Sequence, residues 1–174
     1  MAASRTFKLD ELLSTLPQRG RVTWIGVRPA KGQPLETVGS VEAAPGMGLA
    51  GDRFKGTEAS KRQVTLIQAE HIAGVASMLG RDTIDPALLR RNVVVAGVNL
   101  YALRHARFRV GDVLLEGTGI CAPCAGMEEA LGPGGFNAMR GHGGITARVL
   151  EAGTIAVGDA VAVTEPGVLG VDEV

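Results

Sequence analysis

Aromatic residues, long apolar runs and cysteines are all scarce in this chain of 174 residues. Aromatic side chains make up only 3% of the sequence, so the core must be built from Val, Leu, Ile and Ala. No apolar run approaches the roughly 20 residues that a membrane-spanning helix needs. The first 20 residues also lack the apolar core of a signal peptide. We therefore expect a soluble, cytoplasmic protein that has no membrane partner.

An excess of charge of either sign is also missing. The chain has 18 basic and 18 acidic residues, so its formal net charge is zero. The overall charge therefore predicts no nucleic-acid partner. The local distribution is less even, because the segment 86–111 contains no acidic residue and five arginines: Arg90, Arg91, Arg104, Arg107 and Arg109. Such a cluster could bind phosphate or carboxylate groups, or its members could lie on separate solvated faces.

The composition is that of a globular protein. Hydrophobic residues make up 45% and charged residues 21% of the chain. A chain of this length buries roughly two-thirds of its unfolded surface, so it needs no disulfide or metal to fold. No linker divides it, so we expect a barrel domain over residues 20–165, a helical extension over residues 1–19 and a tail over residues 166–174. The extension is predicted from a leucine stripe at helical spacing: Leu9, Leu12, Leu13 and Leu16.

The pattern along the chain predicts short strands with few helices between them. The predicted strands are Arg21–Val27, Thr37–Ala43, Gln63–Ile67, Asn92–Ala96 and Val113–Glu116. The predicted helices are Phe7–Leu16, Gln68–Leu79 and a short one that begins at Pro86 and ends near Arg91. The glycine-rich segment 45–56 is predicted to be an irregular loop.

A repeated Val-Gly-Asp step indicates the fold. It occurs at 110–112 and again at 157–159, each time before a run of strand-forming residues. Gly and Asp together suit a tight turn that leads into a barrel strand. We therefore predict a β-rich, mixed α+β fold, a small β-barrel with a few short peripheral helices. Helical crossovers are too few for a doubly wound sheet.

The two cysteines, Cys121 and Cys124, are the strongest candidates for chemistry. They stand in a Cys-Ala-Pro-Cys step after a strand, and a helical pattern begins directly after Cys124. A helix start favours a thiolate over a thiol, and a thiolate can act as nucleophile, sulfur carrier or soft metal ligand. Four interpretations stay open: two buried structural thiols, a thioredoxin-like dithiol, a structural zinc site, and a cofactor or sulfur site.

A series of short motifs in order along the chain resembles the MOSC domain, which occurs at the C-terminus of molybdenum cofactor sulfurases and in free-standing bacterial proteins. The similar segments are Gly48-Leu-Ala-Gly-Asp52-Arg53, Arg62-Gln-Val-Thr-Leu-Ile67, Arg90-Arg91-Asn92, Val110-Gly111-Asp112, Pro123-Cys124, Gly143-Gly144-Ile-Thr-Ala-Arg148-Val149 and Gly153-Thr-Ile-Ala-Val-Gly158-Asp159. They cover about residues 20 to 165. The chain differs at Ala59-Ser60-Lys61, where many members have a His-Gly-Gly step, and nothing in it resembles the pyridoxal-phosphate domain of the full sulfurases.

The resemblance implies a β-barrel that binds molybdenum cofactor. It implies that Cys124 is a sulfur carrier or a molybdenum ligand, with Cys121 as a resolving or supporting thiol. The cofactor-binding residues that it implies are Arg62, Arg90, Arg91, Asn92, Asp52, Arg53 and Arg148, and the glycine-rich loop with Arg140 and His142 could close over an anion.

The same resemblance suggests what the protein would act with. Some relatives reduce N-hydroxylated compounds, so the expected activity is sulfur transfer or reduction, with a sulfur or electron donor protein as partner and a pterin or small molecule as ligand. Two alternatives remain: a non-catalytic barrel that binds an anion or a partner, and a dithiol oxidoreductase that uses both cysteines.

Overall fold

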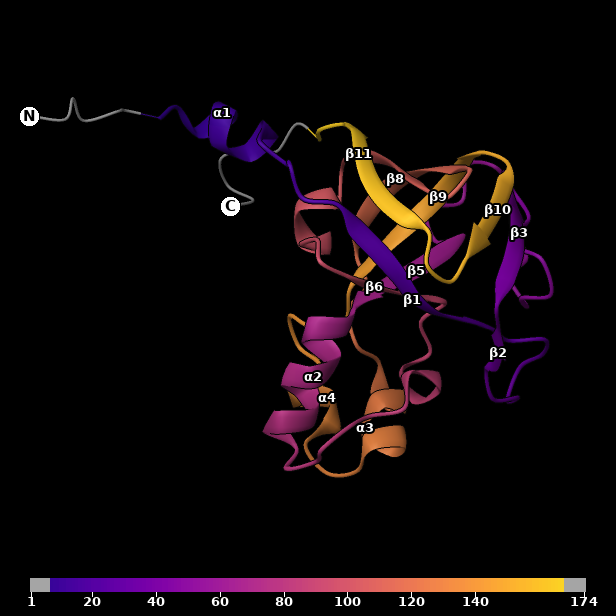
Figure 1. The fold of residues 1–174 in the computed structure, drawn as a ribbon. Helices are drawn as coiled ribbons and strands as arrows, with labels where there is room; N and C mark the ends of the chain where they lie inside the picture. Colours follow the sequence, from indigo (N-terminus) through magenta and orange to yellow (C-terminus); the bar gives the residue numbers. More distant parts are fainter. Residues whose placement is uncertain (1–6, 168–174) are drawn as a thin grey trace, which may run out of the picture.

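Seven strands close into a barrel in the computed structural model, which describes residues 7–167 (Figure 1). The barrel strands are β1 (Gly20–Val27), β5 (Val64–Gln68), β6 (Val93–Ala96), β7 (Arg107–Val110), β8 (Val113–Ile120), β9 (Ile145–Glu151) and β11 (Ala160–Glu165). They follow one another in the order β1-β11-β7-β8-β9-β5-β6, and β6 pairs with β1 to complete the ring. The predicted β-rich α+β barrel is therefore confirmed.

Four short strands lie outside the ring. Strand β2 (Glu36–Val38) pairs with β1, whereas β3 (Ser40–Ala44), β4 (Gly48–Leu49) and β10 (Gly153–Ala156) form a separate three-stranded sheet. The sequence predicted one strand over Thr37–Ala43, and this prediction was wrong in one respect. The chain breaks at Gly39, so that its two halves pair with different sheets.

Only one pair of neighbouring barrel strands is parallel, and it positions the helices. Strands β5 and β6 run parallel, whereas the other barrel strands pair antiparallel. A parallel pair needs a crossover connection. Here the crossover consists of α2 (Ala69–Met78) and the 3-10 helix η1 (Pro86–Leu89). Helices α3 (Ala125–Leu131) and α4 (Gly135–Ala138) lie at the same end of the barrel as α2 (Figure 1).

The interior is aliphatic, as the scarcity of aromatic residues predicts. One buried cluster fills the barrel with residues such as Val22, Leu66 and Leu115 around a single phenylalanine, Phe108. A second cluster lies under the helices and includes Val75 and Met127. A further 3-10 helix, η2 (Leu100–Leu103), buries two leucines in the barrel cluster.

Both Val-Gly-Asp steps form the tight turns predicted for them. One turn joins β7 to β8 and the other joins β10 to β11. Gly111 and Gly158 each take a positive φ, of 57° and 98°. The carboxylate of Asp159 accepts a hydrogen bond from the backbone N–H of Ala156 at 2.7 Å, so the aspartate closes its own turn.

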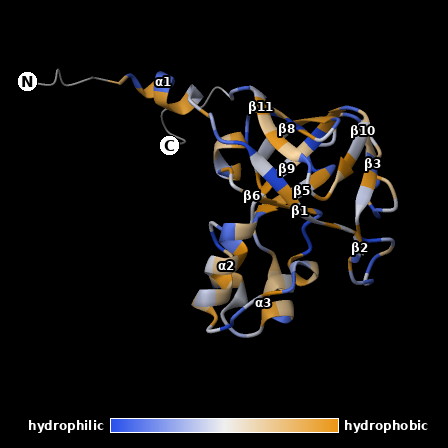
Figure 2. Cartoon of the chain, in the orientation of Figure 1, coloured by the Kyte–Doolittle hydropathy of each residue, from blue (hydrophilic) through white to orange (hydrophobic). Residues whose placement is uncertain are grey.

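The N-terminal helix α1 (Leu9–Ser14) is shorter than the predicted Phe7–Leu16, and it stands apart from the barrel (Figure 2). None of its residues is buried, and Leu12 remains 51% exposed. Of the predicted leucine stripe, Leu16 packs against the barrel core. Residues 1–6 of the predicted extension and residues 168–174 of the predicted tail lie outside the described residues. Within residues 7–167, none of the helices combines the length and the apolar character that crossing a membrane requires.

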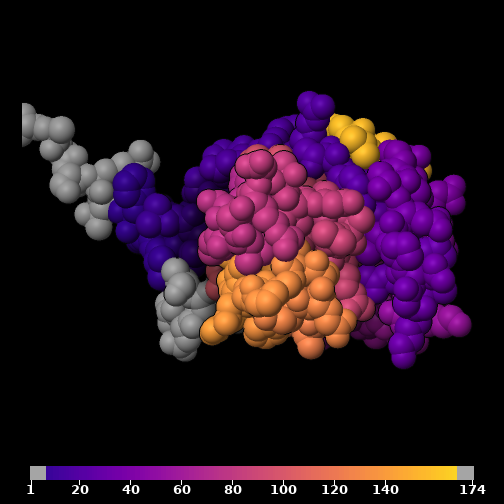
Figure 3. All heavy atoms as spheres, turned by 90° about the horizontal axis from the view of Figure 1, so that it is seen from below, coloured from indigo at the N-terminus to yellow at the C-terminus, as the bar shows by residue number. Residues whose placement is uncertain are grey.

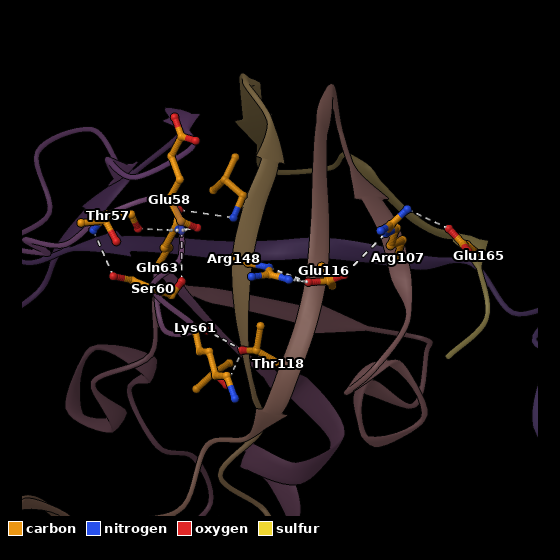
Figure 4. Close-up of polar contacts among 12 residues, drawn as sticks. Thr57, Glu58, Ser60, Lys61, Gln63, Arg107, Glu116, Thr118, Arg148 and Glu165 are labelled. Carbon is orange, nitrogen blue, oxygen red and sulfur yellow. Dashed lines mark hydrogen bonds and ion pairs between the residues drawn. The ribbon is translucent and has the colours of Figure 1, made fainter. Parts of the chain in front are cut away.

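A ladder of alternating charges crosses four neighbouring strands on the outside of the barrel (Figure 4). The strand register places Glu165 opposite Arg107, Arg107 opposite Glu116, and Glu116 opposite Arg148. Each neighbour in this series forms an ion pair with the next. Glu116 is the central acid, because its carboxylate contacts both arginines and its side chain is only 20% exposed. A shift of one residue in any of these strands would break the ladder, so it favours the observed register.

We predict that Glu116→Gln lowers the free energy of unfolding by about 1 kcal/mol, because two arginines lose their carboxylate together. The change should be smaller at 1 M salt, where surface charges are screened. The measurement is urea denaturation at low and high salt. Glu165→Gln is the matched control, because its side chain is 65% exposed and, among residues 7–167, pairs with Arg107 alone. Equal losses from the two variants would contradict a central role for Glu116.

Candidate functional site

A basic cavity of about 400 Å³ opens where β1, β4 and β8 end and where β5 and β6 begin. Among residues 7–167, its wall contains one acidic side chain and five arginines. It is lined by Arg28, Leu35, Asp52, Arg53, Phe54, Arg62, Gln63, Thr65, Arg90, Arg91, Asn92, Ala122 and Cys124. Segments far apart in sequence therefore bring their basic residues together here. Figure 3 shows the face that carries the helices, with the orange α3–α4 region against the magenta α2 region and the purple early part of the chain beside them.

Cys124 is exposed on the wall of this cavity. It caps the start of α3, which confirms the predicted position at the beginning of a helix. The guanidinium of Arg90 lies beside the thiol, with Nη1 3.9 Å from Sγ. Gly126 leaves room for this position of the guanidinium, since a Cβ there would lie 2.5 Å from the same Nη1. The arrangement presents an accessible sulfur next to a permanent positive charge.

Cys121 has a different environment, although it stands only three residues earlier. Its side chain is 1% exposed and its backbone N–H donates to the carbonyl of Gly144 at 2.8 Å. Arg62 Nη2 lies 3.4 Å from its sulfur, so an arginine of the cavity also contacts the buried thiol. Both cysteines are free thiols in the structure. Cys124 is therefore accessible to a ligand in the cavity, whereas Cys121 is buried.

Arg91 is a positioning residue rather than a free cation. It is 2% exposed, and its guanidinium donates to carbonyl oxygens of four residues: Leu89, Cys121, Ala122 and Gly143. Burial lowers the pKa of Arg91 below the ordinary arginine value. These bonds join the start of β6, the cysteine segment and the glycine-rich loop before β9. The sequence predicted a phosphate contact for Arg91, but its N–H groups bind the backbone that shapes the cavity.

Asp52 and Asn92 form a second positioning network. The Asp52 carboxylate accepts from the backbone N–H of Arg28 at 2.8 Å and of Phe54 at 3.2 Å. The amide of Asn92 donates to Asp52 at 3.2 Å and accepts from the hydroxyl of Thr65 at 2.8 Å. Both side chains line the cavity, but their polar atoms are engaged with neighbouring residues. They fix where the arginines around them stand.

Four arginines of the cavity have no carboxylate partner: within residues 7–167, no ion pair joins Arg28, Arg53, Arg62 or Arg90 to an acid. Arg28 shows the consequence most clearly. Burial lowers its pKa, and repulsion from Arg90 and then Arg53 lowers it further, against the attraction of Asp52 and Cys124. Its Nε is also enclosed without a hydrogen-bond partner. An anion in the cavity would relieve this repulsion.

Arg90 is held in an unfavourable backbone conformation. It is the single non-glycine residue with a positive φ (59°) among residues 7–167, at the end of η1. A left-handed conformation costs an L-residue roughly 1–2 kcal/mol relative to glycine. The sequence predicted a helix up to about Arg91, whereas η1 ends at Leu89 because Arg90 turns the chain. Strain of this kind concentrates at binding sites, where the side chain matters more than the backbone.

The model of the MOSC domain matches residues 49–162, well over half of the chain. The chain belongs to the MOSC domain family. No similar sequence is found among curated proteins.

Solved structures with the same fold come from several bacteria. The YuaD protein from Bacillus subtilis superimposes with a TM-score of 0.72 at 20% identity, over 86% of this chain and 98% of its own. YiiM from Geobacillus stearothermophilus gives a TM-score of 0.67 at 17% identity, over 84% of this chain and 75% of its own. YiiM from Escherichia coli gives 0.63 at 18% identity, over 83% and 69%. These likenesses show the shared MOSC fold.

Three residues that the sequence suggested for the site lie elsewhere on the MOSC barrel. Arg148 points outward from β9, where it binds Glu116 and lines a separate hollow of about 280 Å³. Arg140 is exposed and does not line the cavity of Cys124. His142 packs its ring edge-on against His71 of α2, with the centroids 4.9 Å apart. The glycine-rich loop therefore contributes a backbone carbonyl, that of Gly143, rather than its charged side chains.

The most important residue missed by the sequence analysis is Arg28. It follows Val27, the last residue of β1, and Pro29 and Gly32 indicated only a loop there. The usable signal was its position, because a polar residue directly after a buried barrel strand stands at the barrel's open end. Phe54 and Thr65 also line the cavity without having been predicted.

We predict that Arg90→Gly separates stability from binding. Glycine removes the left-handed strain but gains entropy in the unfolded chain, so the free energy of unfolding should stay unchanged or rise by up to about 1 kcal/mol. Affinity for inorganic phosphate should fall roughly tenfold, because one charge of the cavity is lost. Urea denaturation and calorimetric titration measure the two effects. Arg90→Gln is the control, which keeps the strain and loses only the charge. A large loss of stability in Arg90→Gly would contradict this account.

We also predict that the His71–His142 contact makes the free energy of unfolding depend on pH. Burial, followed by His142, lowers the pKa of His71, while Glu70 opposes the shift. The unfolded state therefore binds a proton at His71 more readily than the folded state does. The stability that the neutral imidazole contributes is present above the unfolded pKa of about 6.5 and is lost as the pH falls below it. His71→Phe keeps a ring against His142, so its stability should fall less than that of the wild type between pH 7.5 and pH 5. Parallel loss in both proteins would contradict the prediction.

Proposed function

We propose that this MOSC-domain protein binds molybdenum cofactor in the arginine-lined cavity and presents Cys124 to it as a molybdenum ligand or a sulfur carrier. The observation that carries the proposal is that an exposed thiol shares the wall of one cavity with arginines that pair with no acid of residues 7–167. A cavity of about 400 Å³ lies within the usual range for small-molecule sites, roughly 300–1,000 Å³.

The cavity fits the charged part of such a cofactor. The phosphate of a pterin cofactor is a compact anion, and arginine can bind phosphate with two parallel hydrogen bonds. Arg53, Arg62 and Arg90 are exposed there, and none of them forms an ion pair with an acid among residues 7–167. Arg28 adds a charge whose neighbours repel it. Binding of the phosphate would therefore replace arginine–arginine repulsion by attraction, without first breaking an existing ion pair.

The cavity also fits the part of the cofactor that holds the molybdenum. Thiolate sulfur is a soft donor that suits a molybdenum centre held by dithiolene sulfurs. Cys124 supplies that donor, and the guanidinium of Arg90 lies beside it, with Nη1 3.9 Å from Sγ. When bound, the cofactor would supply the redox-active metal. The chain itself supplies the anion site, the sulfur and the backbone framework around them.

Our prediction for the thiol uses protein purified from a host that makes molybdenum cofactor. Cys124→Ser should reduce the molybdenum content by at least about tenfold, because the soft donor is replaced by a hydroxyl. Pterin content should fall less, because the arginines remain. Elemental analysis and fluorescence of the oxidised pterin measure the two separately.

A pair of arginine variants provides the matched control. Arg62→Gln removes a charge from the cavity and should lower both the molybdenum and the pterin content. Arg140→Gln removes an exposed arginine outside the cavity and should change neither. If the wild type contains no pterin and takes none up from a donor, or if Cys124→Ser retains molybdenum fully, the proposal fails. Retention of the pterin with an extra sulfur on Cys124 in intact mass spectra would assign the carrier role.

A further inference from the structure

A second and larger hollow adjoins the arginine cavity. Its volume is about 630 Å³, and it shares Asp52, Arg53 and Phe54 with the first cavity. The remaining wall consists of Lys55 and of the segment 29–31, which ends in Lys31. Three consecutive residues, 52–54, line both spaces, so both hollows border this segment. A ligand that extends from the side of Cys124 along this segment would reach the second hollow.

The second hollow is also positively charged. Lys31, Arg53 and Lys55 line it, and none of them forms an ion pair with an acid among residues 7–167. The single acid that lines it, within the part of the chain that the structure describes, is Asp52, whose oxygens already accept from Arg28, Phe54 and Asn92. The positive charge therefore has no counterpart within the hollow. Lysine binds phosphate as a point charge, whereas arginine does so in a fork.

Phe54 stands at the boundary between the two hollows. Its side chain is half-buried, and the backbone N–H of Phe54 is held by Asp52 at 3.2 Å. Its ring packs over Gly56, where an added Cβ would lie 2.4 Å from the ring. The backbone is thus held and the ring packs closely on Gly56, in a chain where only 3% of residues are aromatic. An aromatic ring that stands between basic groups is a suitable surface for a nucleobase, since stacking adds to phosphate contacts.

The two basic loops are also tied to each other. The backbone N–H of Arg53 donates to the carbonyl of Arg28 at 2.6 Å, and the carboxylate of Asp52 accepts from the backbone N–H of Arg28. The segment 28–31 and the segment 52–55 therefore form one unit. A ligand that crosses from one hollow to the other would contact this unit along its length. The basic side chains of the unit are already held together before the ligand binds.

We propose that the second hollow binds the diphosphate-linked nucleotide portion of an extended ligand whose other end lies in the arginine cavity. The diphosphate crosses at Arg53, its outer phosphate faces Lys31 and Lys55, and the base lies against Phe54. This inference rests on the proposed function, because it assigns the ligand of that site to a nucleotide-extended class. It predicts that ADP, which carries a diphosphate and a base, occupies both hollows.

The test is calorimetric titration of the full chain with inorganic phosphate, ADP and adenosine. In the wild type, ADP should bind at least about tenfold more tightly than phosphate, because it gains the lysine contacts and the base contact. In the double variant Lys31→Gln/Lys55→Gln, affinity for ADP should fall at least about tenfold while affinity for phosphate changes less than about twofold. Adenosine, which has no phosphate, should bind far more weakly than ADP.

Two further variants separate this inference from the proposed function. Arg62→Gln should weaken both phosphate and ADP, because both use the first cavity. Lys61→Gln is the matched control, since Lys61 is exposed and lines a different hollow, and it should change neither. Equal binding of phosphate and ADP, or an equal effect of the lysine variants on both, would overturn the second site and leave the first intact. Binding of ADP that ignores Arg62→Gln would overturn the single spanning ligand.

Discussion

The buried guanidinium of Arg91 is the interaction on which the rest of the site depends. It donates to carbonyl oxygens of three segments that are distant in sequence, at Leu89, at Cys121–Ala122 and at Gly143. A buried arginine must have its N–H groups satisfied, and carbonyl oxygens satisfy them without neutralising the charge. The cysteine segment is therefore fixed by a cation, and the positive charge stays in the wall of the cavity. Arg91 thus both holds the backbone around the cavity and contributes to its positive charge.

The cavity combines several features that oppose folding. Arg28 is partly buried among other arginines, Arg90 occupies a left-handed conformation, and no acid of residues 7–167 pairs with the exposed cations. Proteins retain unfavourable features of this kind at functional sites, where the rest of the fold offsets them. The fold offsets them with a closed barrel and a dense aliphatic core. An anion that enters the cavity would lower the repulsion, so binding and stability should be linked through the same arginines.

The barrel and part of the site could be predicted from the sequence because their signals are local. Short β-branched runs, the two Val-Gly-Asp turns and the helical pattern after Cys124 each depend on neighbouring residues. The split at Gly39 was missed because it depends on which sheet each half joins. Arg28 was missed, and Arg148 was assigned to the wrong region, for a related reason. The direction of a side chain on a barrel depends on strand register, which a single sequence does not reveal. The resemblance to the MOSC domain supplied the order of the motifs but not the direction of each side chain.

The same dependence on strand face explains how a chain of zero net charge builds a strongly basic cavity. On the outer face of the barrel, the register pairs arginines with acids across neighbouring strands: Arg107 with Glu116 and Glu165, and Arg148 with Glu116. Arg109 of β7 reaches across β8 to pair with Glu151 of β9. Around the cavity, arginines come from loops and strand ends, where no strand register supplies an acid opposite them. Asp52, the one acid of residues 7–167 that lines the cavity, is engaged by Asn92 and by two backbone N–H groups. Arg107, Arg109 and Arg148 on the strands are thus paired with acids, whereas, within residues 7–167, the arginines at the strand ends around the cavity are not. A positive potential at one end of the barrel follows from the topology and does not require an excess of basic residues in the chain.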